Sequence, residues 1–69
     1  MAIAGGACSA YRCWVIAGEL FVSATTRLRT DCATVDDAFQ RLSRGEAVTV
    51  AGADMPALRR VLAREGVRG

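Results

Sequence analysis

The fold is decided by residues 34–51, which read TVDDAFQRLSRGEAVTVA. Apolar side chains in the first part recur at the spacing of one helical face, behind a threonine suited to the N-cap position. Gly45 is placed to end that helix in the left-handed conformation, and valines then alternate with smaller residues. The stretch therefore predicts a helix over residues 34–44 and a short strand over residues 46–51.

The residues before this helix predict a β-hairpin. Residues 11–16 are rich in aromatic and β-branched side chains, and Gly18 lies in the short turn that follows them. Residues 20–28 then alternate as a second strand. The side chains expected to face the core are those of Leu20, Val22, Ala24, Thr26 and Leu28. Residues 1–9 carry small side chains and are predicted to be a flexible lead-in.

A second helix is predicted after the strand over residues 46–51. Asp54 can cap this helix, and Pro56 lies in its first turn, where the missing N–H does no harm. Its buried stripe is expected to consist of Met55, Leu58, Val61 and Leu62. Gly66 ends the helix, and residues 67–69 are expected to fray.

These elements follow one another in the order β-β-α-β-α, which predicts an α+β fold with a single small domain over residues 10–66. We expect a three-stranded, mainly antiparallel sheet with strand order 2-1-3 and two helices packed on it. A chain of 69 residues buries only about 60% of the surface it exposes when unfolded. A core of this size therefore leaves few residues to form a deep catalytic pocket.

The composition argues against an enzyme. The chain has no His and no Lys, so its nine basic residues are all Arg. Without His there is no Ser-His-Asp or Cys-His pair, and without Lys there is no Schiff base and no Walker-type phosphate loop. Asp36 and Asp37 are adjacent on a helix and do not share a face, and their position fits the electrostatics of a helix start. We therefore predict no catalytic residue and no cofactor.

The thiols and the apolar segments bear on the compartment. The spacing of Cys8, Cys13 and Cys32 matches no C-x-x-C redox or zinc motif, so we interpret them as reduced thiols of a cytoplasmic protein and expect no metal. A disulfide from Cys13 to Cys8 or to Cys32 is the alternative for an exported protein. The start of the chain lacks the basic and apolar regions of a leader, and residues 13–26 carry Glu19 and are too short to span a bilayer. We expect no membrane partner.

One face of the hairpin is the first candidate for a binding site. If the core face of the second strand is buried, Phe21 points outward, and a solvent-exposed Arg12 brings Trp14 and Ile16 to the same side. These four residues then form an exposed, largely apolar patch of the kind that binds a protein partner or forms a homodimer through the hairpin. The alternative is that a helix covers this face, or that Trp14 lies in the core and Arg12 reaches past it to solvent.

Arginines on the second helix are the other candidate. Residues 55–69 contain four Arg against one acid, Glu65, which gives the segment a net charge of +3. Such a segment could contact phosphates or an acidic protein. The candidate contacts are Arg59, Arg60 and Arg64, with Arg27 and Arg29 as an extension. The alternative is an ordinary solvated helix face, and the overall charge of +2 is small for a nucleic-acid-binding protein.

Residues 39–50, FQRLSRGEAVTV, are similar to a helix–Gly–Glu–strand phrase of small phage head–tail joining proteins. A comparable phrase occurs in antitoxins of the Phd/YefM type. Both families continue with a strand where residues 54–65 of this chain predict a helix. The resemblance therefore implies only a helix end followed by a strand, and it carries no functional residue to this chain.

The function that these observations favour is that of a small non-enzymatic protein that binds a protein partner as an adaptor or inhibitor. Small phage or mobile-element proteins, including inhibitors of host defence, are a source of such chains. One alternative is a nucleic-acid-binding regulator that acts through the Arg-bearing helix as a dimer. Another is a structural subunit of a larger assembly.

Overall fold

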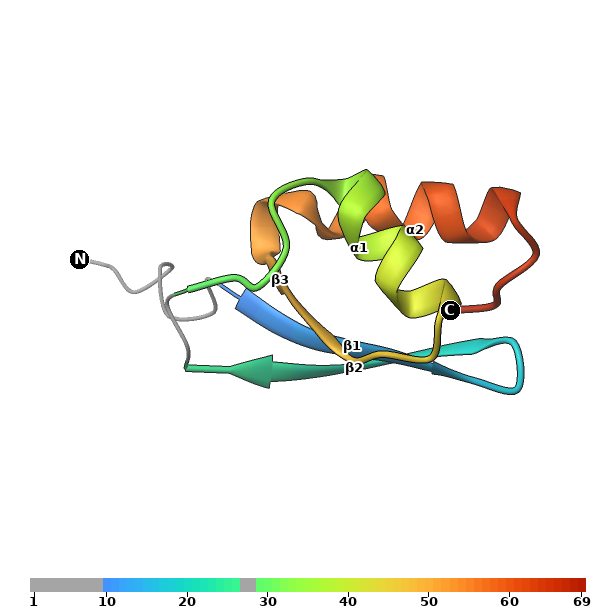
Figure 1. Cartoon of the computed structure of the whole chain (residues 1–69), viewed down its shortest axis with the longest axis horizontal. Helices are drawn as coiled ribbons and strands as arrows, with labels where there is room; N and C mark the ends of the chain where they lie inside the picture. Colours follow the sequence, from blue (N-terminus) through green and yellow to red (C-terminus); the bar gives the residue numbers. More distant parts are fainter. Residues whose placement is uncertain (1–9, 27–28) are drawn as a thin grey trace.

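A computed structural model describes residues 10–26 and 29–69 (Figure 1). The predicted lead-in over residues 1–9, as well as Arg27 and Leu28, lie outside the described residues. The elements are β1 (Ala10–Ile16), β2 (Glu19–Thr25), α1 (Val35–Ser43), β3 (Val48–Ala51), the 3₁₀-helix η2 (Gly52–Asp54) and α2 (Met55–Arg64). This order confirms the predicted β-β-α-β-α arrangement.

The sheet has the predicted order β2-β1-β3, and both neighbouring pairs are antiparallel. Cys13 at the centre of β1 lies opposite Val22 on one side and Val48 on the other. Both helices lie on the same face of the sheet (Figure 1). The domain therefore has two layers, with one sheet face covered by helices and the other turned away from them. We call these the helix face and the outer face.

The core lies between the helices and the helix face. Strand residues alternate so that Cys13 and Val48 are fully buried, and Leu58 of α2 packs against them without exposure. The buried apolar residues of this cluster are Cys13, Leu20, Ala38, Leu42, Val48, Val50, Met55, Leu58 and Leu62. Ala24 was expected in the core but is exposed, because the end of β2 extends beyond the helices (Figure 1).

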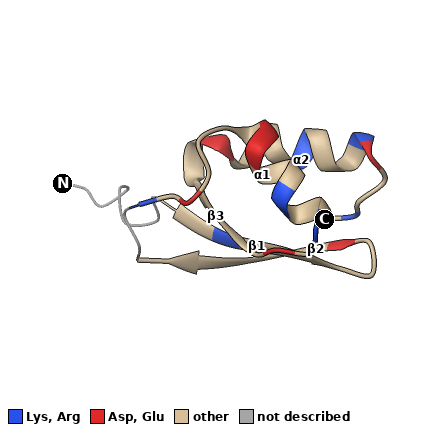
Figure 2. Ribbon diagram, viewed as in Figure 1, with Lys and Arg blue, Asp and Glu red and all other residues tan. Residues whose placement is uncertain are grey.

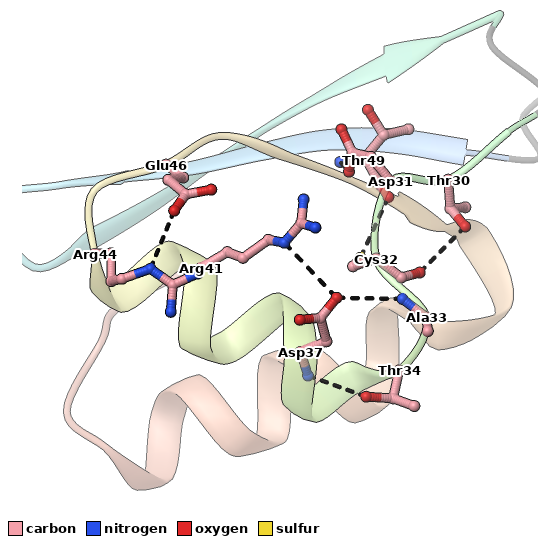
Figure 3. A network of polar contacts seen from close by, with 10 residues as sticks. All are labelled: Thr30, Asp31, Cys32, Ala33, Thr34, Asp37, Arg41, Arg44, Glu46 and Thr49. Carbon is pink, nitrogen blue, oxygen red and sulfur yellow. Dashed lines mark hydrogen bonds and ion pairs between the residues drawn. The ribbon is translucent and has the colours of Figure 1, made fainter.

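The start of α1 is built as predicted, whereas the start of α2 is not. Thr34 is extended, and its hydroxyl accepts the Asp37 amide at 3.0 Å. The Asp37 carboxylate also accepts the Ala33 amide at 3.3 Å and lies 3.7 Å from Arg41 (Figure 3). Asp54 occupies the N-cap of α2, but its side chain makes no capping bond. The preceding 3₁₀ turn gives Asp54 helical dihedral angles, and these do not direct its carboxylate toward the free amides.

The hairpin turn explains the tight connection of β1 and β2. Ala17 and Gly18 both have positive φ, at 52° and 77°, which is the signature of a two-residue type I′ turn. This turn matches the twist of the two strands and fixes their register, which places Ile16 opposite Glu19. Ala17 is an unusual residue in this position, because its Cβ disfavours positive φ.

The edge of β3 that faces away from β1 is covered by residues 31–32, which precede α1 (Figure 3). The Asp31 carboxylate accepts the Thr49 amide at 2.7 Å, and the Asp31 amide donates to the Thr49 carbonyl at 3.3 Å. The Cys32 thiol donates to the same carbonyl at 3.4 Å. Thr49, whose backbone these contacts hold and which lies opposite Arg12 of β1, is only 1% exposed.

Within residues 10–26 and 29–69, the free edge of β2 is covered only at its beginning. The Leu20 amide donates to the Arg68 carbonyl at 2.6 Å, and the Arg68 amide donates to the Gly18 carbonyl at 2.9 Å. Glu19 and Arg68 form a parallel β-bridge. Residues 67–69, which the sequence predicted to fray, are therefore held against the hairpin by backbone hydrogen bonds and by Val67, which packs on the core.

Candidate functional site

The outer face carries an apolar patch near the hairpin turn. Trp14 and Phe21 lie directly opposite each other on β1 and β2, and their rings stack with centroids 6.1 Å apart and planes 15° from parallel. Phe21 is 40% exposed and Ile16 is 58% exposed. We call Trp14, Ile16 and Phe21, with Arg12 on the same face, the outer patch.

The helices leave this patch open because they cover the opposite face of the sheet (Figure 1). Trp14 is half-buried by its neighbours on the sheet and lies outside the core between the layers. Arg12 is half-buried as well. Of the two arrangements that the sequence left open, the structure therefore shows the one in which Trp14, Ile16 and Phe21 share a face that neither α1 nor α2 covers.

The outer face is not exposed over its whole length. Ala10 and Thr49 have the same orientation as Arg12 in the strand alternation, yet each is only 1% exposed. The Thr49 hydroxyl has no hydrogen-bond partner among the described residues. Solvent-accessible apolar surface is thus concentrated at the end of the hairpin that carries the turn.

The predicted arginines are brought together only in part. Arg59, Arg60 and Arg64 are exposed on α2, and Glu65 is the acid at its end (Figure 2). In the described part of the chain, the ion pairs are Arg41–Asp37 and Arg44–Glu46, so the α2 arginines have no acidic side-chain partner. Arg29 belongs to the segment that runs to the β3 edge, away from the β2 side of the sheet. Arg27 lies outside the described residues.

Two hollows that no local sequence pattern predicts flank α2. The larger, of about 390 Å³, lies between α2 and the helix face of β1 and β2. We call it the β2–α2 groove, and its lining residues are Tyr11, Val22, Gly52, Met55, Pro56 and Arg59. A smaller hollow of about 170 Å³ lies between Leu20, Leu62 and Val67. Arg59 lines both, and its guanidinium donates to the Gly69 carbonyl at 3.4 Å.

The described thiols are poor candidates for chemistry. The Cys13 thiol is buried 3.6 Å from the Met55 sulfur, and this burial raises its pKa to about 11 although Arg59 opposes the shift. Burial and the nearby Asp31 carboxylate also raise the pKa of Cys32. Both thiols are free and protonated at neutral pH, and thus weakly nucleophilic. Cys8 lies outside the described residues.

Two further properties concern ligands and membranes. Within residues 10–26 and 29–69, no group of three or more His, Cys, Asp or Glu side chains is arranged to hold a metal ion. In that same part of the chain, neither helix has the length and apolar character needed to cross a bilayer.

A scan against protein-family models and searches of curated proteins and of solved structures found no match for this chain.

Proposed function

We propose that this chain is a small non-enzymatic protein that binds a protein partner through the outer patch, as an adaptor or inhibitor. The observation that supports this is the exposure of Ile16 and Phe21, 58% and 40%, beside the stacked Trp14 on a sheet face without helices. Aromatic side chains of this kind dominate the energetics of protein interfaces. Arg12 supplies a charged group at the margin of the apolar surface.

The chemistry of the chain agrees with binding in place of catalysis. No His or Lys is available for proton transfer or covalent chemistry. The described thiols have raised pKa values and lie in or beside the core. A cytoplasmic location is part of the proposal, because free thiols such as Cys13 and Cys32 persist in reducing compartments. So is an origin in a phage or mobile element, which rests on the small size alone.

Quenching of Trp14 fluorescence tests the patch directly, because the chain contains a single Trp. Acrylamide should quench the isolated protein, and binding of a partner should protect Trp14 and shift its emission to shorter wavelength. The oligomeric state is measured in the same sample by sedimentation. An unquenched Trp14 in a monomeric protein contradicts the proposal.

Affinity capture with two single variants tests whether the patch binds a protein. Ile16→Lys places a charge at a side chain of the patch that is more exposed than Phe21, whereas Gln40→Lys places the same charge at an exposed site on α1. A protein bound through the patch should be retained by the wild type and by Gln40→Lys and be lost with Ile16→Lys. Equal retention by all three rules the patch out as the interface.

A nucleic-acid-binding role remains a second proposal, supported by the three exposed α2 arginines, which have no acidic side-chain partner in the described part of the chain. Binding to duplex DNA or RNA would then weaken steeply with salt, with a slope on a logarithmic plot of roughly −0.9 for each phosphate contact on DNA. Replacing Arg60 and Arg64 by Gln should lower that slope. Undetectable binding at low salt removes this alternative.

A further inference from the structure

We propose that the free edge of β2, together with the β2–α2 groove, binds an extended acidic peptide segment of a partner by β-strand addition. This surface is separate from the outer patch, because the groove lies on the helix face and the patch lies on the outer face. The inference goes beyond the proposed function, since it assigns a second site with its own ligand chemistry. Three observations carry it.

The first observation is that β2 offers unused backbone groups. In a two-residue hairpin, the residues that flank the turn bond to each other, and bonded and non-bonded pairs then alternate. Ile16 and Glu19 are the flanking pair, so Leu20, Val22 and Ala24 direct their N–H and C=O groups away from β1. The bond from Leu20 to Arg68 agrees with this direction. Among the described residues, Val22 and Ala24 have no backbone partner on that side.

The second observation is that the chain itself pairs with this edge. Arg68 forms a parallel bridge with Glu19 and bonds to Leu20 and Gly18, while the preceding Val67 packs against the core. The beginning of the edge therefore already accepts an added extended segment with an apolar side chain directed under α2. Val22 and Ala24 continue the same edge beyond the point that this segment covers.

The third observation is the groove beside the open part of the edge. Its volume of about 390 Å³ falls within the range of ligand-binding pockets. Tyr11, Val22, Met55 and Pro56 supply apolar walls, and Val22 contributes both a wall and an open backbone group. Every second side chain of an added strand would point toward the helices and enter this groove.

The charge at the groove selects the class of ligand. Arg59 lines the groove and has no acidic side-chain partner in the described structure, and Arg60 and Arg64 extend the positive charge along α2. A carboxylate on the peptide would pair with Arg59. A second copy of this chain fits less well at the same edge, because edge-to-edge pairing would bring the Arg59-bearing walls of both copies together, and like charges oppose such contacts.

The test uses a synthetic acetylated and amidated peptide, Thr-Glu-Thr-Leu-Thr-Glu-Thr, in which Leu and both Glu occupy one face of a strand. The control peptide replaces each Glu by Lys. Titration into the ¹⁵N-labelled full chain should shift the amide signals of Val22 and Ala24 and slow their hydrogen exchange, with at least about tenfold weaker binding of the Lys peptide. Absence of shifts at millimolar concentrations of the Glu peptide overturns the proposal, as does equal binding of both peptides.

Modified peptides and matched variants separate backbone pairing from charge. N-methylation of the peptide amides that face β2 should abolish binding without any change to the protein. Arg59→Gln should weaken binding about tenfold, whereas Arg64→Gln, a change of the same kind farther along α2, should weaken it much less. Unchanged binding of the N-methylated peptide, or equal effects of the two Arg variants, contradicts strand addition beside Arg59.

Two further measurements distinguish this site from others. Ile16→Lys should leave peptide binding unchanged, so the outer patch and the β2 edge can fail independently. Sedimentation of the peptide-free chain should show a monomer whose Val22 and Ala24 amides exchange rapidly. Concentration-dependent association that protects these two amides would assign the edge to a second copy and overturn the peptide proposal.

Discussion

The two edges of the sheet differ in how far their outward-facing backbone groups are paired. An edge strand exposes backbone N–H and C=O groups that can pair with another chain. At β3, Asp31 satisfies both groups of Thr49, its carboxylate accepting the amide at 2.7 Å and its own amide donating to the carbonyl. At β2, the described segments pair only with the part next to the turn, through Arg68. In the described structure, one edge is closed and the other is half open.

This difference shows at which edge strand the domain tolerates unpaired backbone N–H and C=O groups. β3 has only four residues and lies against α1, so an unpaired Thr49 would weaken a short strand that contributes Val48 and Val50 to the core. β2 has seven residues and is held to β1 over its full length by the hairpin register. The longer strand tolerates an open edge, which makes that edge available for binding.

The closed edge should be the more sensitive one, and Asp31→Ala tests this with the largest expected effect. The substitution leaves the buried Thr49 amide without its charged acceptor, so we expect a loss of about 2–3 kcal/mol in the free energy of unfolding. Urea denaturation gives the value. Asp36→Ala, which removes an exposed carboxylate with no such bond, is the control. A loss below that of the control would mean that Asp31 does not secure β3.

Alkaline pH should weaken the central strand between the two edges. The pKa of Cys13 is raised to about 11 from 9.0, so the folded state holds this proton more tightly than the unfolded state does. The contribution of this thiol to the free energy of unfolding is therefore fully present below pH 9. It is lost as the pH rises toward 11, and the loss is on the order of 2 kcal/mol. Urea denaturation at several pH values measures the slope. Cys13→Ala should flatten it, and an equal slope in that variant contradicts the assignment.

The partly covered edge should lose less when its cover is removed. Deleting residues 67–69 removes three backbone hydrogen bonds, two to the hairpin and one from Val67 to Leu62, together with the partly buried Val67 side chain. We expect a loss of about 1–2 kcal/mol, with the fold retained. Hydrogen exchange of the Leu20 amide should become fast, while exchange of Thr49 should not change. Loss of protection at Thr49 would show that the two edges are coupled.

The smallest expected effect concerns the Thr49 hydroxyl, whose burial on β3 is expected to destabilise the folded state slightly. The Thr49 hydroxyl is buried without a hydrogen-bond partner among the described residues, so Thr49→Val should raise the free energy of unfolding by about 0.5–1 kcal/mol. Thermal denaturation is sensitive enough to detect such a change. Thr34→Val is the opposite control, because it removes a hydroxyl that caps α1 and should be destabilising by about 1 kcal/mol. A destabilised Thr49→Val variant would indicate that the hydroxyl is satisfied.

The elements of this fold were predictable because their signals are local. The apolar spacing after Thr34, the stop at Gly45 and the alternation around Val48 each act within a few residues, and all three agree with the structure. The strand order also followed, because a hairpin joined to a third strand by a helix has few simple arrangements.

The features that a sequence pattern did not reveal depend on contacts between distant segments. Asp31 lies in a connection without periodicity, and its partner Thr49 comes after an intervening helix. Arg68 was placed in a fraying end because nothing nearby binds it, whereas its partners Gly18 and Leu20 belong to the hairpin. The exposure of Trp14 likewise depended on which face the helices cover. The β2–α2 groove is formed by segments that meet only in the folded chain.

The pairing of Arg68 with the hairpin turn also bears on the order in which the chain assembles. The hairpin closes between neighbouring residues on a microsecond timescale, whereas the Glu19–Arg68 bridge joins segments from nearly opposite ends of the described chain. Closing so long a loop costs entropy that only the already assembled layers can offset. The bridge is therefore expected to form last during folding and to open first. The pairing of Arg68 with the beginning of β2 is then the contact with the shortest lifetime in the domain.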